Sequence, residues 1–86
     1  MNIWTKNVNA APLLINKADG VFKVSGKARG GNISVLGNFI FQQTNPDALV
    51  FADGEGFVIE SVSTQPIDGL TIDPLLATAE VMIFYN

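Results

Sequence analysis

The sequence contains neither cysteine nor histidine in its 86 residues. Without cysteine the fold contains no disulfide, and the redox compartment of the protein cannot be inferred from cysteine usage. The two absences together remove the commonest ligands of zinc, copper and haem iron. They also exclude Ser-His-Asp and Cys-His nucleophile pairs and the usual general base near neutral pH. We therefore predict a non-enzymatic protein that holds no cofactor and no metal.

Charged residues are scarce: they make up 15% of the chain, against about 25% in an average globular protein. Apolar residues make up 48%, which is ample for a packed core and argues against disorder. A chain of this length is near the size where one core suffices, so we expect residues 1–86 to form a single domain. The net charge of −3 and the lack of a basic patch interleaved with aromatic residues argue against nucleic-acid binding.

Long apolar runs are also missing. Nothing approaches the roughly 20 apolar residues that span a membrane. The start of the chain, residues 1–7, lacks the apolar segment of a signal peptide. We therefore expect a protein that is made in a cytoplasm and has no membrane partner, and that is still able to leave the cell as part of a particle.

What the sequence does contain is alternation of apolar and polar residues. The longest such stretch covers residues 31–41, and one of its faces carries Ile33, Val35, Gly37, Phe39 and Phe41. The opposite face is only half polar, because it includes Leu36 and Ile40. A strand that avoids water on both faces is expected to offer one face to its own core and the other to a second surface.

Further short stretches alternate in the same way and are separated by turn signals. In residues 21–28, we expect Phe22, Val24, Gly26 and Ala28 to face inward. The turns at residues 29–32 and 53–56 are expected to close hairpins, and Leu75–Ala77 is long enough for one helical turn after a proline. Together these signals predict an all-β fold: a small antiparallel β-sandwich or jelly-roll-like barrel of seven to eight short strands. Residues 1–8 are expected to be a docking arm or an edge strand.

The half-polar faces predict an interface. We expect six apolar residues to lie opposite the core side of their strands: Leu36, Ile40, Val58, Val62, Met82 and Phe84. Clustered on a free monomer they would form a patch of several hundred Å², a size typical of interaction sites. The alternatives are that a bulge reverses the assignment of faces, or that both faces are buried in the sandwich. We also expect Ile3 and Trp4 to anchor this interface, because a buried tryptophan is a common hot spot of binding energy.

The charges offer weaker signals. All five basic residues lie in the first 29 positions, whereas seven of the eight acidic residues come later. This order is consistent with steering towards an acidic partner or with head-to-tail pairing of copies. We prefer the interpretation as ordinary solvated turns and strand edges, because sequence order is a poor guide to surface position. Acidic turns such as Asp53–Glu55 resemble calcium loops or a glycosidase pair only superficially, because the spaced ligand pattern and a cleft are missing. We interpret them as turn chemistry.

One family resemblance bears on function. The run Gly30 to Gly37, a polar loop, the run Ala48 to Phe57 and a final β-rich segment, Ala79 to Tyr85, resemble the small glycine-rich β-sandwich proteins encoded among the structural genes of tailed bacteriophages. Those proteins serve as capsid decoration (cement), head-fibre or related virion components. The chain departs from their pattern after the polar loop, where a tryptophan is frequent in the family and Leu49 and Val50 stand here.

The resemblance implies a structural protein of the virion, made in the host cytoplasm, which binds the major capsid protein, further copies of itself, or both. A cement protein needs no chemistry, only a rigid β body with an apolar face, repeated around a symmetric lattice. The main alternative is a small carbohydrate- or ligand-binding β-sandwich module for fibre or cell-surface recognition. A small enzyme subunit or regulator is a third, more distant alternative.

Overall fold

A computed structural model describes residues 2–37, 48–61 and 64–86. In these residues the chain forms eight β-strands and one short 3-10 helix, η1. The strands are β1 (Asn2–Val8), β2 (Leu13–Ile15), β3 (Val21–Arg29), β4 (Ile33–Gly37), β5 (Leu49–Phe51), β6 (Gly56–Glu60), β7 (Leu70–Asp73) and β8 (Thr78–Tyr85). The helix η1 covers Lys17–Asp19. The prediction of an all-β fold is confirmed.

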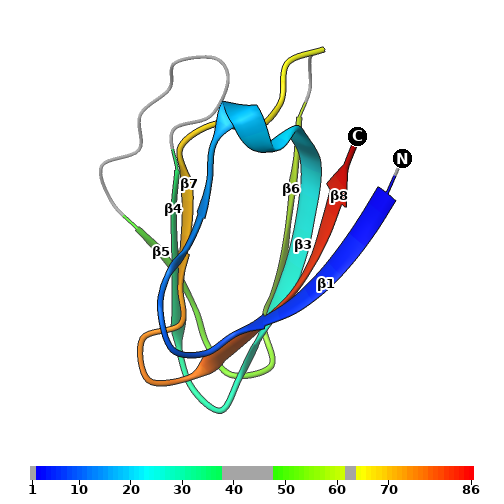
Figure 1. Cartoon of the computed structure of the whole chain (residues 1–86). Helices are drawn as coiled ribbons and strands as arrows, with labels where there is room; N and C mark the ends of the chain where they lie inside the picture. Colours follow the sequence, from blue (N-terminus) through cyan, green and yellow to red (C-terminus); the bar gives the residue numbers. More distant parts are fainter. Residues whose placement is uncertain (1, 38–47, 62–63) are drawn as a thin grey trace.

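The strands form two four-stranded sheets that pack face to face (Figure 1). Sheet A has the order β1-β8-β3-β6, and sheet B has the order β2-β7-β4-β5. Every pairing among these strands is antiparallel. This is the strand order of a jelly roll, and the two sheets stay open as a sandwich instead of closing into a barrel.

The core lies between the two sheets and is built from branched aliphatic residues. Its fully buried side chains include Ile33, Leu70 and Ile72 from sheet B and Val24 from sheet A. Among the described residues no polar or charged residue is buried. Because the charged residues stay at the surface, the core carries no desolvated charge that would need a partner.

Alternation predicted the inward residues of most strands. In β4, Ile33 and Val35 are buried, while Leu36 is exposed. In β3 the prediction fails at one point, because the register with β8 shifts between Val21 and Lys23. This β-bulge turns Val21 into the core, where the sequence pattern had placed Phe22. One extra residue reverses the alternation on one side of it.

The two turns predicted as hairpins are arches instead. Residues 29–32 connect β3 in sheet A to β4 in sheet B, and residues 53–56 connect β5 in sheet B to β6 in sheet A. The arches meet at the same end of the sandwich, where the Gly54 N–H donates to the Ala28 carbonyl at 2.8 Å. The Gly30 N–H donates to Asp53 Oδ1 at 2.9 Å. The glycine and aspartate residues of these two turns predict that the chain reverses, but they do not indicate whether the next strand joins the same sheet or the opposite one.

The structure decides two smaller predictions, on residues 1–8 and on Leu75–Ala77. Asn2–Val8 is an edge strand, since β1 pairs with β8 along its whole length. Leu75–Ala77 forms a turn without helix, closed by the Ala77 N–H donating to the Pro74 carbonyl at 2.8 Å. The central strand, expected to run through residue 41, is described only as far as Gly37. Phe39, Ile40 and Phe41 lie outside the described residues.

Candidate functional site: the outer face of sheet A

The outer face of sheet A is the side of that sheet turned away from the core. Paired residues of antiparallel strands share a face, so the strand register defines this surface. We call it the outer A face, and its residues are Ile3, Thr5, Asn7, Lys23, Ser25, Lys27, Gly56, Val58, Glu60, Glu80, Met82 and Phe84.

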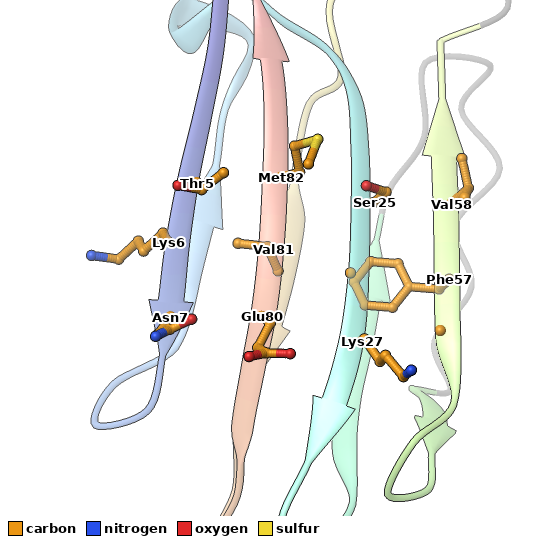
Figure 2. Close-up of a pocket in the computed structure, with 12 residues that line it drawn as sticks. Thr5, Lys6, Asn7, Ser25, Lys27, Phe57, Val58, Glu80, Val81 and Met82 are labelled. Carbon is orange, nitrogen blue, oxygen red and sulfur yellow. The ribbon is translucent and has the colours of Figure 1, made fainter.

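The residues of the outer A face form cross-strand rows. The central row runs from β1 to β6 and consists of Thr5, Met82, Ser25 and Val58. Figure 2 shows these side chains at one level across the four strands. Two apolar side chains therefore alternate with two small hydroxyl side chains. The surface is neither a dry apolar patch nor a fully polar one.

Small residues make part of this face concave. A hollow of about 660 Å³, the face hollow, is lined by residues from all four strands of sheet A (Figure 2). Its lining includes Ser25 and Gly26 on β3, Met82 on β8 and Val58 on β6. The hollow is shallow and open, so it suits a protruding loop or side chain of a partner better than an enclosed small molecule.

Gly26 has a packing role at this position. A Cβ built on Gly26 would lie 2.5 Å from Cζ of Phe57 and 3.1 Å from Cγ1 of Val81. The ring of Phe57 extends from β6 across to β3, as Figure 2 shows. A glycine on the inward face of a strand usually marks a bulge or a place where a large ring packs across the backbone. At Gly26 the structure contains the ring.

Charged residues lie near both ends of the outer A face. At one end, Arg29 Nε donates to Glu80 Oε1 at 2.7 Å, which links β3 to β8. At the other end, Lys23 lies 4.0 Å from Glu60 and its ammonium group lies 5.2 Å from the centroid of the Phe84 ring. Lys23 therefore covers part of Phe84. Apolar side chains on this face therefore lie beside charges of both signs, and polar groups at the margin of an apolar surface are typical of protein interfaces.

The structure brings four of the predicted interface residues together on the outer A face: Ile3, Val58, Met82 and Phe84. Leu36 also faces outward, but it lies on sheet B, across the sandwich from the other four. The predicted single cluster is thus divided between two surfaces. Ile40 and Val62 lie outside the described residues.

Trp4 lies at the edge of sheet A, a position that the alternation of apolar and polar residues did not predict. It pairs with Ile83, on the core-facing side of β1, but 47% of it is exposed because β1 is an edge strand. Its ring lies 5.5 Å from the Lys6 ammonium group. A second hollow of about 460 Å³, the side hollow, opens beside Trp4. Trp4 lines it together with Tyr85 and the three residues of β2, which include Leu14. Only the spatial neighbourhood of β1 and β2 reveals this hollow.

The aspartates of the acidic turns accept hydrogen bonds from backbone N–H groups. Asp19 accepts from the Asn16 N–H at 2.7 Å, Asp68 from the Lys17 N–H at 3.0 Å, and Asp73 from the Leu75 N–H at 2.9 Å. Among the described residues no group of three or more acidic side chains is placed to hold a metal ion. Asp19 and Asp73 bind backbone within their own turns, as interpreted. Asp68 instead links its turn to Lys17, which is distant in the sequence.

No protein-family model, curated protein or solved structure matches this chain. Within residues 2–37, 48–61 and 64–86, no helix has the length and apolar character to cross a membrane. Function is therefore inferred from the surfaces of the sandwich.

Proposed function

We propose that this protein is a non-enzymatic structural protein that binds a protein surface through the outer A face. The observation that carries the proposal is that four apolar side chains share that face: Ile3, Val58, Met82 and Phe84. Val58 and Met82 also line the face hollow. Exposed apolar side chains grouped within a polar rim are typical of protein contact sites.

In line with the resemblance, we propose that the bound surface is the shell of a tailed-phage virion. The partner would be the major capsid protein, and further copies of the chain would bind around the same lattice. Each copy needs only modest affinity, because repetition on a symmetric shell adds avidity. The jelly-roll order is compatible with this role, since the same architecture occurs in viral capsid proteins, although a fold does not by itself imply a function.

The chain offers a matched pair of variants for testing the face. Met82 and Leu36 are each 39% exposed, and they lie on the outer faces of different sheets. Met82→Asp places a charge in the proposed contact, where it would be stranded without a partner. Leu36→Asp adds the same charge to the opposite surface. Both variants are expected to fold, because neither side chain belongs to the buried core.

The measurement is co-sedimentation of each variant with purified phage capsids, together with light scattering of the protein alone. We expect Met82→Asp and Val58→Asp to lose binding at least tenfold relative to Leu36→Asp, equivalent to about 1.4 kcal/mol. Circular dichroism provides the control for folding. Unchanged binding by Met82→Asp and Val58→Asp, or an unmodified chain that ignores capsids, would refute the proposal.

A second candidate function, carbohydrate binding, is favoured by the side hollow. Trp4 and Tyr85 present aromatic rings there, and Asp19 adds a carboxylate. Aromatic walls with a few polar groups are usual in small-ligand sites. A glycan array is the discriminating measurement: a signal that disappears in Trp4→Ala and persists in Val58→Ala would support this function over the structural one.

A further inference from the structure

Strand β1 is an open sheet edge. Its partner β8 occupies one side along seven residue pairs, Asn2–Tyr85 to Val8–Ala79, and the register contains no shift. On the other side, no strand of the described residues pairs with it. A long, regular edge presents free N–H and C=O groups that template pairing with another strand.

The other three sheet edges are less suited to pairing. The edges of sheet B are β2 and β5, each three residues long. The second edge of sheet A is β6, which has five residues and ends in Glu60. Short strands and charges are the usual protections of an edge. By contrast, β1 has seven residues, no proline and a single charge, on Lys6.

We propose that β1 pairs in antiparallel fashion with β1 of a second copy, about a two-fold axis at Thr5. This inference concerns the strand edge and does not depend on the outer A face binding a shell. Sheet A of one copy would continue into sheet A of the other, with both cores on the same side. The occupant of the edge is therefore a second copy of the chain.

The sequence of β1 selects this register. With the axis at Thr5, all residues of Asn2–Val8 find partners: Ile3 faces Asn7 of the other copy, and Trp4 faces Lys6. Moving the axis to Lys6 places two lysines directly opposite each other, a destabilising pair, and leaves Asn2 and Ile3 unpaired. Moving it to Trp4 leaves Asn7 and Val8 unpaired and separates the cation from the ring.

Trp4 and Lys6 supply complementary chemistry for the pairing. Within one chain the Lys6 ammonium group already lies 5.5 Å from the Trp4 ring centroid. In the pair, each ring would face the lysine of the other copy, so the cation–π contact is kept across the symmetry axis. The core-facing side chains of the second β1 would also project over the side hollow, and would cover apolar surface of Trp4 and Leu14.

Cysteine cross-linking tests the register, since the chain has no cysteine of its own. Thr5→Cys should form a disulfide-linked dimer under mild oxidation. Ile3→Cys alone and Asn7→Cys alone should not, because equivalent residues would be about 13 Å apart along the strands, too far for a disulfide. An equimolar mixture of Ile3→Cys and Asn7→Cys should cross-link.

Two substitutions of one residue test the same pairing without a disulfide. Trp4→Glu places a carboxylate opposite Lys6 of the other copy, whereas Trp4→Lys places two ammonium groups there. Since the contact occurs twice in the dimer, we expect the dissociation constant from sedimentation velocity to be about tenfold higher for Trp4→Lys than for Trp4→Glu.

Two results would overturn the inference: a folded Thr5→Cys protein that stays uncross-linked, or equal cross-linking of Thr5→Cys and Ile3→Cys. Equal dissociation constants for Trp4→Lys and Trp4→Glu would also count against it. Repeating the Thr5→Cys experiment with Val58→Asp separates the two proposals, because Val58 lies on β6 at the far edge of sheet A. In that protein the two proposals predict that capsid binding is lost and cross-linking is retained. Loss of cross-linking would contradict the pairing of β1, and retained capsid binding would contradict the role of the outer A face.

Discussion

Replacing Gly26 with alanine would force the Phe57 ring to move. The added Cβ would lie 2.5 Å from Cζ and 2.6 Å from Cε1 of the ring, whereas carbon atoms pack best at about 3.5–4.0 Å. The ring would have to shift by about 1 Å. Its retreat is restricted by Phe51, whose ring centroid lies 5.2 Å from that of Phe57, and the Phe57 side chain is buried.

The expected loss of stability follows from two opposing terms. Overpacking of this kind typically costs about 1–3 kcal/mol. Alanine lowers the entropy of the unfolded chain relative to glycine, which returns about 0.4–1 kcal/mol. We expect a net destabilisation of Gly26→Ala of about 1–2 kcal/mol, equivalent to a decrease in Tm of roughly 4–16 °C for a domain of this size.

The assay is thermal and urea unfolding followed by circular dichroism. Ser25→Ala is the control, because Ser25 is the neighbouring position on the outer A face. The double variant Gly26→Ala/Phe57→Leu removes the end of the ring together with the clash, so it should lose less stability than the sum of the single variants, by about 1 kcal/mol. Strict additivity, or a Gly26→Ala protein as stable as the parent, would refute the packing argument.

Two further predictions concern the core and the surface. Leu70→Ala should destabilise the fold by about 2–5 kcal/mol, because Leu70 is fully buried, whereas Leu76→Ala should change little, because Leu76 is fully exposed; urea unfolding compares the two, and similar losses would contradict the assigned core. The ion pair between Arg29 and Glu80 is half exposed and should contribute less than about 1 kcal/mol. A double-mutant cycle to alanine at low and high salt measures it, and a coupling that is large and insensitive to salt would be contrary to expectation.

The sequence predicted the strands better than their arrangement. Alternation is a local property, so it identified the buried side of β4, with Ile33 and Val35 inward, without knowledge of the partner strands. It failed at Val21 because a single bulged residue reverses the alternation. It also missed the arches, because Gly30 and Gly54 permit a chain reversal whether the next strand joins the same sheet or the opposite one.

The candidate site shows the same limit. Leu36 and Met82 were both expected to face away from the core, and both do. Whether two outward faces belong to one surface depends on which sheet each strand joins. That choice is made by long-range pairing: β4 joins β7, and β8 joins β3. The side hollow is likewise invisible in the sequence, because its walls combine β1, β2, η1 and β3 with β8, which is distant along the chain.

The pairing of β1 with β8 has a mechanical consequence. Asn2 lies beside Tyr85 at one end of the ladder (Figure 1). Tension applied between these two residues would load a single pair at a time, so the strands would unzip from that end. Tension applied along a strand would instead shear all the pairs together. The β1–β8 ladder should therefore yield at low force when Asn2 and Tyr85 are pulled apart, and resist much better when the load runs along the two strands.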